Sequence, residues 1–491
     1  MPMDVGVLQY VAEQGLHWLL HLGPSLLLPT LCCWALARYV LGVSLTYLFL
    51  CLYLELQLKA RRAISGSTSS AGNDCFPSKL APEERLAELR GVKVVSVDSY
   101  TASGQTVPPS KRVSVLYQGA MPAGEESNYS FSGHRGRRPR EEAALGALED
   151  DAWQQRLRCL REGAEVHRQV RQHVQRKVRP GMELKEIVEM VEKGTSTLVG
   201  FDAKHPLGRG WAFPTGLSLN EVAAHDTVNP GDPSRWLKST DLMKLDFGVQ
   251  VEGHILDCAF SLSFNPMHDE LMRAVQEATE EGIRNAGPDA LVSEIGGCIR
   301  EVMEAAEVHR PDGRVLPVKS IKNLTGHSIL PYKIHAGKSL PSVNTGGNVR
   351  MLCGELWAIE TFGSAGGVGY VTAQGDCSHF MRPASDPPGA VQRCALSKGA
   401  LSLLDIIDRR FGTLAFCPRW VVQEAAQCKS PLLKGCDHRW WSAPLNELCN
   451  MGVVTSYPPL ADLPGSHTAQ YEHTILLGPR CKEVLTRGTD Y

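Results

Sequence analysis

The chain has 491 residues, enough for one large domain or for two or three ordinary ones. Its 51 Lys and Arg nearly balance 53 Asp and Glu, which disfavours a strongly basic nucleic-acid-binding protein. With 43% hydrophobic and 21% charged residues, the composition excludes a mostly disordered chain. The 15 cysteines are odd in number and form no Cys-x-x-Cys pair. We therefore expect free thiols in a reducing compartment, not a disulfide framework or a zinc ribbon.

The N-terminal segment 1–62 is strongly apolar. Residues 14–37 contain no Asp, Glu, Lys or Arg, and a second apolar run, 39–54, follows after a single arginine. A membrane-spanning helix needs about 20 apolar residues, so this pattern predicts a transmembrane helix, as one or two spans within 14–58. The alternative is a hydrophobic helical hairpin packed on the protein or on a partner. By the positive-inside rule, the catalytic part is expected in the cytosol because three basic residues follow directly: Lys59, Arg61 and Arg62.

Further along, residues 63–104 are predicted to be a linker and a region of low order, because 65–73 are rich in Ser and Gly. The next stretch, to about 141, is predicted to be mostly irregular. It includes a run of four arginines at 135–140, which indicates a solvated basic loop or a contact with RNA or acidic lipid. After residue 141, apolar periodicity predicts helices and two strands joined by a Glu-Gly turn. The expected helices are 141–179, 183–198, 269–286 and 292–306, and the strands are 242–251 and 255–264.

Two aspartates stand out in these predicted strands. Asp246 and Asp257 each lie within an apolar run, where an unpaired carboxylate is costly to bury. An antiparallel hairpin would bring the two side by side. Two buried like charges repel each other, so we expect a cation between them. Arginine or backbone amides would serve as well as a metal ion on this evidence alone.

Three more residues favour a metal ion over arginine or backbone amides. Glu360 and Glu472 are also carboxylates within apolar strand patterns, and His327 follows a glycine after an apolar stretch, with His335 eight residues later. Hard oxygen donors with one imidazole suit two divalent ions of the Mn, Fe, Co or Zn type, about 3.5 Å apart. The sequence therefore predicts a two-metal centre in a mixed α+β domain.

A longer set of motifs resembles a known family, the type 2 methionine aminopeptidases of the pita-bread fold. The resemblance extends from about residue 105 to 491. It implies a pseudo-symmetric antiparallel sheet covered by helices, with a helical insertion over 382–451. It is carried by Ala212-Phe213-Pro214-Thr215-Gly216, Ala223-Ala224-His225, Lys244 to Gly248, Ile255 to Phe260, Asn323 to Ile329, Ile359 to Ser364, Phe411 to Phe416, Ser456 to Leu460 and Thr468 to Thr474.

The resemblance implies roles for single residues. Asp246 would bind one ion, Asp257 and Glu472 would bridge both, and His327 and Glu360 would complete the second. Glu360 would also shuttle protons, while His225 and His335 would act on the scissile carbonyl and the tetrahedral intermediate. The methionine side chain would enter an apolar slot lined by Phe213, His225, Ile334, His335, Phe362 and Tyr457.

The implied reaction is removal of the initiator methionine from nascent polypeptides by two-metal hydrolysis of the first peptide bond, with a small second residue preferred. The implied partners are nascent N-termini and the ribosome, and a monomer is expected. One departure from the family is Ala390, where a site-lining histidine is expected. Two alternatives stay open: a proline-specific aminopeptidase of the same fold, and a non-catalytic adaptor that binds the ribosome or RNA.

Overall fold

The computed structural model describes residues 103–129, 151–383, 395–427 and 439–491. The chain divides after Lys79 into two units, and all described residues belong to the second, Leu80–Tyr491. The predicted membrane anchor in 1–62, most of the predicted linker and the basic run 135–140 therefore lie outside the described residues.

Four long strands form the centre of this unit, and their residues are buried almost throughout. β5 and β6 form the hairpin expected from the sequence. Its turn places Glu252 and Gly253 at φ of 52° and 81°, the left-handed pair that two-residue hairpin turns favour. The four strands are β5 (Leu242–Val251), β6 (His254–Ser263), β11 (Leu356–Ala365) and β16 (His467–Leu477).

The strands are arranged in two larger antiparallel sheets. One runs β1-β17-β16-β11-β8-β7, with β9 paired to β11 and β10 to β9; the other runs β2-β5-β3, with β6 paired to β5. Two small pairings, β12-β15-β4 and β13-β14, flank them. The remaining strands are β1 (Glu125–Asn128), β2 (Arg209–Trp211), β3 (Gly216–Leu219), β4 (Val222–Ala224), β7 (Glu307–His309), β8 (Val315–Ser320), β9 (Thr325–Ile329), β10 (Ser339–Pro341), β12 (Thr372–Ala373), β13 (His379–Met381), β14 (Thr455–Tyr457), β15 (Leu460–Ala461) and β17 (Cys481–Val484).

Buried hydroxyl groups join the two sheets between β6 and β16. Thr474 Oγ1 accepts from the backbone N of Asp257 at 2.8 Å and donates to its carbonyl oxygen at 2.6 Å. Ser261 Oγ likewise accepts from the N of Gln470 and donates to its carbonyl oxygen, both at 2.9 Å. Each hydroxyl satisfies one donor and one acceptor of the facing backbone, so the two sheets form one continuous layer.

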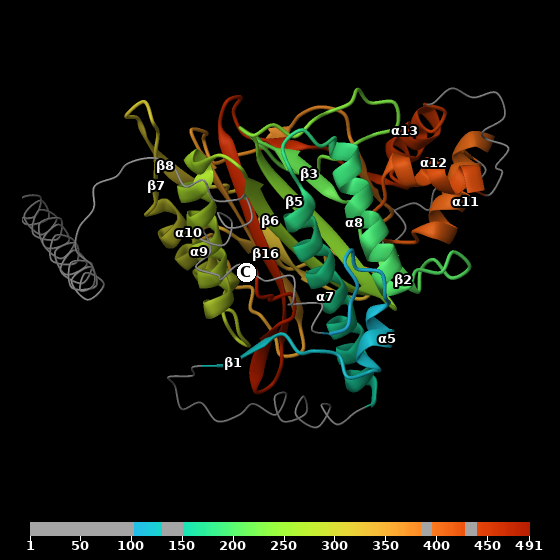
Figure 1. Ribbon diagram of the computed structural model, residues 1–491, viewed down its shortest axis with the longest axis horizontal. Helices are drawn as coiled ribbons and strands as arrows, with labels where there is room; N and C mark the ends of the chain where they lie inside the picture. The colour runs from blue at the N-terminus through green and yellow to red at the C-terminus, as the bar shows by residue number, and fades with distance from the viewer. Residues whose placement is uncertain (1–102, 130–150, 384–394, 428–438) are drawn as a thin grey trace, which may run out of the picture. The chain divides into compact units, whose positions relative to one another are not determined.

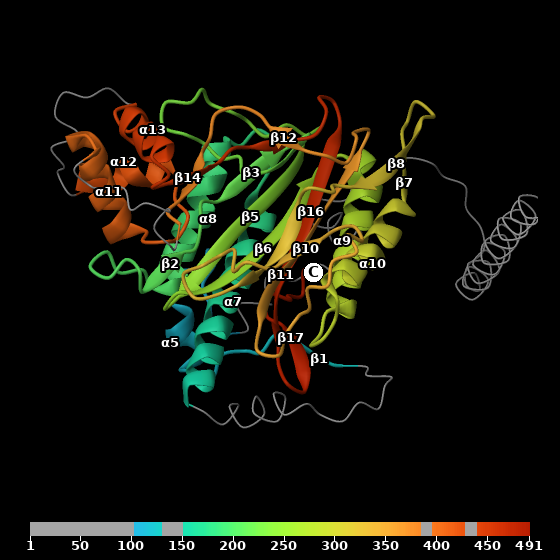
Figure 2. The same ribbon diagram turned by 180° about the vertical axis from the view of Figure 1, so that it is seen from behind.

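Four helices cover one face of this layer, as the views from front and back show (Figures 1 and 2). They form two pairs, one before the β5–β6 hairpin and one after it, which matches the expected pseudo-symmetric arrangement. Their bounds are α7 (Asp151–Lys177), α8 (Leu184–Val199), α9 (Asp269–Asn285) and α10 (Val292–Glu304).

Three further helices lie within the range 382–451 that the resemblance assigns to an insertion. They are α11 (Lys398–Arg410), α12 (Pro418–Gln427) and α13 (Ser442–Asn450), and they pack around a separate apolar cluster that includes Phe411, Phe416 and Trp420. The stretch predicted to be irregular is partly ordered, since it contains α5 (Val113–Tyr117) and β1. β1 pairs with β17, so tertiary contact decides its conformation.

The predicted transmembrane helix requires correction. Among the helices that the structure describes, none is both long and apolar enough to cross a bilayer. The prediction of a transmembrane helix is therefore contradicted. The apolar run 14–58, on which it rested, is not among the described residues.

Candidate metal centre and active site

The β5–β6 hairpin brings two aspartates to one face of the sheet. Asp246 lies opposite Ala259, and Asp257 lies opposite Gly248. The two carboxylates are thus diagonal neighbours, because side chains two positions apart on a strand share a face. This arrangement agrees with the expectation from the sequence that a hairpin would pair them.

Strands β9, β11 and β16 bring the other three predicted ligands to the same place. Glu360 lies directly opposite Glu472, and His327 lies opposite Ala358, two residues before Glu360. His327 Nε2 lies 3.5 Å from Asp257 Oδ2 and 3.4 Å from Glu360 Oε1. The ligand atoms of Asp257, His327 and Glu472 all lie within 4.8 Å of one another. The five residues therefore converge although they come from two separate sheets.

The electrostatics of this cluster call for a cation. Burial raises the pKa of Asp246 to about 7, and burial together with neighbouring carboxylates raises the pKa values of Asp257, Glu360 and Glu472 well above their usual range. Burial lowers the pKa of His327, so its imidazole is neutral. Within the described part of the chain, no Lys or Arg forms an ion pair with any of the four carboxylates.

Buried polar atoms without partners give a direct test of whether metal fits. Asp246 Oδ1, Asp257 Oδ1, Glu472 Oε1 and His327 Nδ1 are buried and make no hydrogen bond. Buried polar atoms are nearly always paired in folded proteins. Three unpaired carboxylate oxygens beside a neutral imidazole form an oxygen-rich donor set with nitrogen, as borderline divalent cations prefer. The residues present fit divalent metal ions.

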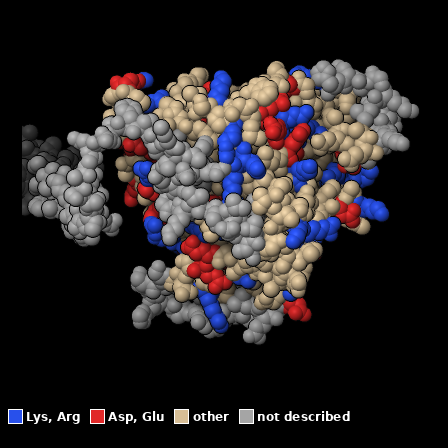
Figure 3. Space-filling view, viewed as in Figure 1, with Lys and Arg blue, Asp and Glu red and all other residues tan. Residues whose placement is uncertain are grey.

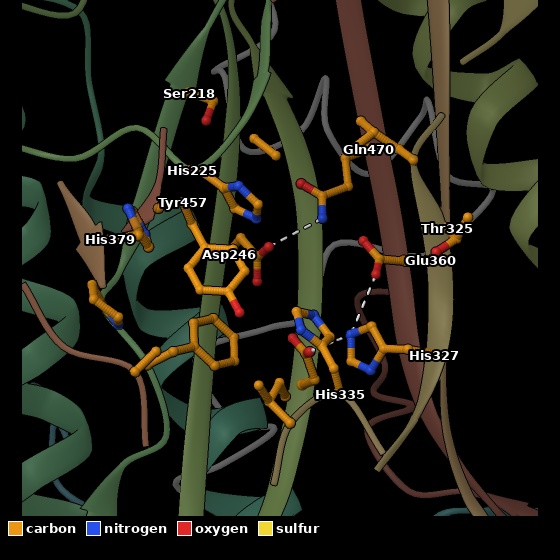
Figure 4. A pocket seen from close by; sticks show the side chains of 18 of the residues that line it. Ser218, His225, Asp246, Thr325, His327, His335, Glu360, His379, Tyr457 and Gln470 are labelled. Atoms are coloured by element: carbon orange, nitrogen blue, oxygen red, sulfur yellow. Dashed lines mark hydrogen bonds and ion pairs between the residues drawn. The ribbon is translucent and has the colours of Figure 1, made fainter. Parts of the chain in front are cut away.

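A cavity of about 230 Å³ opens over these ligands. Figure 4 shows His225, His379 and Tyr457 on one side of it, with His327 and Glu360 on the other. All six predicted substrate-binding residues line it, and so do four of the five predicted ligands, all but Glu472. The described lining residues are Phe213, Pro214, Gly216, Ser218, Ala224, His225, Asp246, Asp257, Asn323, Leu324, Thr325, His327, Ile334, His335, Glu360, Phe362, His379, Met381, Ala415, Tyr457 and Gln470.

Three neutral histidines border the cavity around Tyr457. Burial lowers the pKa of His225 to about 4 and that of His379 to about 3, and it also lowers the pKa of His335. The His225 ring lies 5.8 Å from that of His379 and 5.9 Å, edge-on, from that of Tyr457. His225 has φ of 65°, a conformation that is uncommon outside glycine and recurs at functional sites.

Sequence reasoning missed His379 and Gln470. His379 pairs with Tyr457 across β13 and β14 and lines the cavity. Ala390, where the family resemblance leads us to expect a histidine, lies outside the described residues. Gln470 Nε2 donates to Asp246 Oδ2 at 3.1 Å. Its position two residues before Glu472 on β16 was the available signal, because alternate residues of a strand share a face.

A model of metallopeptidase family M24 matches residues 158–391. A methionine aminopeptidase 2 from Puccinia graminis is 47% identical over 396 residues, which cover 79% of this chain and 82% of that protein. One from Dictyostelium discoideum is 42% identical and covers 84% and 87%, respectively. A solved structure of a thermophilic Arx1 shares the fold, with a TM-score of 0.50, 15% identity and coverage of 65% and 87%.

The pita-bread arrangement and its buried carboxylate–histidine centre define a metallopeptidase of the M24 type. Within that class, identity of 42–47% over most of the length of both chains decides the subgroup. The chain belongs to the methionine aminopeptidase 2 family.

Proposed function

We propose that this enzyme removes the initiator methionine from polypeptides by hydrolysing the first peptide bond at a two-metal centre. The convergence of four carboxylates, two of them fully buried, and one neutral histidine beneath an apolar cavity carries this proposal. Methionine aminopeptidase is the activity that the names of the relatives state.

By resemblance to the family, the five ligands would divide between two ions. Asp257 and Glu472 would bridge both ions, Asp246 would complete the first, and His327 and Glu360 would complete the second. The close grouping of Asp257, His327 and Glu472 supports this division. The ion in use is Mn, Co, Fe or Zn, since this oxygen-rich set with one imidazole suits each of them.

Bound divalent ions would polarise the scissile carbonyl and lower the pKa of a water molecule towards neutrality. The chain itself moves protons and stabilises developing charge. Glu360 carries a proton from the attacking water to the leaving amine. His335 donates a hydrogen bond to the carbonyl oxygen as negative charge develops on it. His225 bounds the cavity on the opposite side and orients the scissile carbonyl.

The methionine side chain is held by the apolar part of the cavity. Phe213, Ile334, Phe362 and Tyr457 present rings and methyl groups, and His225 and His335 present neutral imidazoles. A thioether packs well against aromatic edges. A cavity of about 230 Å³ closed by such groups favours a small second residue in the substrate.

The enzyme acts on the N-termini of nascent polypeptides, and we place its catalytic unit in the cytosol, as a monomer near the ribosome. The eight cysteines that the structure describes are all free thiols, which supports a reducing compartment. Among the described residues visible in Figure 3, groups of Lys and Arg lie beside groups of Asp and Glu.

Peptide cleavage by the metal-loaded protein tests the proposal. With Mn or Co supplied, we expect Met to be released from Met-Ala-Ser and no residue from Ala-Pro-Ala. The variant Asp257→Asn should bind metal more than about 100-fold more weakly, because loss of a direct ligand exceeds the loss of an outer-shell partner. Its release of Met should fall below detection.

Each other result has a distinct meaning. Cleavage of Ala-Pro-Ala would identify a proline-specific aminopeptidase of the same fold. Two bound ions without cleavage of either peptide would contradict the proposed reaction and favour the adaptor. The residual metal content of Asp257→Asn, measured by atomic emission, separates loss of ions from loss of chemistry.

A further inference from the structure

The face of the sheet opposite the cavity carries the residues that follow three of the proposed ligands. Phe247, Cys258 and His473 each lie directly after a ligand in the sequence, and successive side chains of a strand point to opposite faces. All three are at most 1% exposed. They face α7 and the segment 486–491. These two elements therefore contact the ligand strands on the side opposite the cavity.

His167, on α7, links the two strands of the aspartate hairpin. Its Nε2 lies 3.0 Å from the carbonyl oxygen of Phe247 and 3.1 Å from that of Cys258. Two carbonyl acceptors require this nitrogen to carry the proton. The ring also stacks on Phe247, with centroids 3.8 Å apart. One side chain therefore fixes both β5 and β6 one residue after each aspartate.

Tyr491 links β6 to β16 in a similar way. Its hydroxyl donates to the carbonyl oxygen of Ala259 at 2.7 Å, and lies 3.0 Å from Cys258 Sγ and 3.4 Å from the carbonyl oxygen of Glu472. Cys258 Sγ itself donates to that Glu472 oxygen at 2.9 Å. The hydroxyl thus contacts the backbone two residues after Asp257, one proposed bridging ligand. It also contacts the backbone carbonyl of Glu472, the other proposed bridging ligand.

Buried contacts fix the Tyr491 ring. His473 stacks on one side with centroids 4.6 Å apart, and the Arg171 guanidinium lies 4.4 Å from the ring centroid. Arg171 binds Asp490 with two short bonds, at 2.6 and 2.7 Å. Arg171 is one helical turn after His167, so both project from the same face of α7. The helix therefore holds β5 and β6 directly through His167, and through Arg171 it supports the Tyr491 ring, whose hydroxyl contacts β6 and β16.

We propose that His167 and Tyr491 are positioning residues for the metal centre, which hold β5, β6 and β16 at the separation that two-ion binding requires. The inference rests on the proposed function. Outer-shell groups that fix a ligand's position typically contribute 10- to 100-fold to metal affinity. Here the held groups are strand backbones, so a small lateral shift of one strand changes the distances between several ligands at once.

The full-length variant Tyr491→Phe tests this, because it removes the hydroxyl and keeps the ring. We expect Mn²⁺ to bind about tenfold more weakly in titration calorimetry of metal-stripped protein. The kcat for Met-Ala-Ser should fall, with KM little changed. The matched control is Tyr129→Phe, because Tyr129 Oη donates to the carbonyl oxygen of Gly478 at 2.9 Å, a comparable bond that involves none of the ligand strands' site residues.

His167→Phe is the second variant, since it keeps the stack and removes the nitrogen. Its control is His268→Phe, which loses a bond of 3.1 Å from a buried histidine to the carbonyl oxygen of Thr240. Weaker Mn²⁺ binding in the two test variants but not in the two controls, at similar thermal midpoints of the metal-free proteins, supports the inference. If His167→Phe does not fold, the comparison of Tyr491→Phe with Tyr129→Phe alone tests the inference.

Two results would overturn it. In the first, Tyr491→Phe binds Mn²⁺ within twofold of the wild-type affinity, and its thermal midpoint falls as much as that of Tyr129→Phe. The hydroxyl would then have a purely structural role. Wild-type protein that binds no Mn²⁺ would overturn the proposed function, and this inference with it. The wild-type titration therefore separates the two failures.

Discussion

At the scale of single residues, His268 offers a test of how a buried imidazole affects stability. It is 1% exposed, and burial together with nearby positive charge lowers its pKa to about 4. An unfolded histidine has a pKa of about 6.5. Between these values the unfolded chain binds a proton that the folded chain does not. Stability is therefore full above pH 6.5 and decreases as the pH falls towards 4, by up to about 1.4 kcal/mol per pH unit.

The variant His268→Gln should show a shallower pH dependence of its urea midpoint over this window. Glutamine has no titratable group and keeps an amide donor for the carbonyl oxygen of Thr240. Groups far from this site affect both proteins alike. His467 does not, because its ring lies 4.5 Å from that of His268 and its pKa is also lowered to about 4, so the difference between the two curves reports the His268–His467 pair. Parallel curves from pH 6.5 to 4.5 would show that the pKa of this imidazole is the same in the folded protein as in the unfolded chain.

Residue chemistry also explains which site members were predictable. Asp246 and Asp257 are conspicuous because carboxylates rarely occur in apolar strands, and the structure brings both to the cavity. His379 is not conspicuous, since its strand has three residues and its partner Tyr457 comes from a distant segment. Only the pairing of β13 with β14 brings it beside His225.

At the scale of elements, Gly326 sets how closely β9 approaches β11. A Cβ at this position would lie 2.5 Å from the carbonyl oxygen of Ala358 and 3.3 Å from the backbone N of Glu360. Gly326→Ala must push β9 away and carry the neighbouring His327 with it. We expect a loss of stability of about 1–3 kcal/mol and weaker binding of Mn²⁺, measured by urea unfolding and titration calorimetry.

Gly297→Ala, in α10, is the matched control for this substitution. Its added Cβ would have its nearest neighbour at 3.4 Å, an ordinary contact. Alanine favours a helix over glycine by about 0.5–1 kcal/mol, so this variant should be neutral or more stable. Equal stability of the two variants would contradict a tight β9–β11 contact.

Long elements with clear periodicity could be predicted closely. The strand expected at 242–251 is β5, and the one expected at 255–264 differs from β6 by one residue at each end. Short strands could not be predicted. The sequence Glu-Glu-Ser-Asn of β1 has little strand propensity, and it is a strand because Glu125 to Asn128 pair with β17.

At the scale of the whole molecule, all the described residues that line the cavity lie between Phe213 and Gln470. Removal of residues 1–102 should therefore leave kcat/KM for Met-Ala-Ser within about twofold of the full chain. Steady-state cleavage by the two proteins, each loaded with Mn, is the measurement. A drop of tenfold or more, with unchanged metal content, would show that residues 1–102 contribute to the site.

The fold as a whole was accessible from the sequence through motifs more than through periodicity. Alternating strands and helices indicated only an α+β domain, whereas the ordered set of motifs indicated the pita-bread arrangement that the structure shows. The connection between β6 and β16 could not be predicted from motifs or periodicity. It depends on hydrogen bonds between the Thr474 and Ser261 hydroxyls and backbone groups far away in the sequence.

The wide spacing of the proposed ligands along the chain has a consequence for the enzyme's own synthesis. Asp246 is translated long before Glu472, and the bridging pair is incomplete until both exist. A copy still on the ribosome before residue 472 is made has no complete centre and cannot act on any N-terminus, including its own. A methionine removed from the growing enzyme before that point must therefore be removed by a different enzyme molecule.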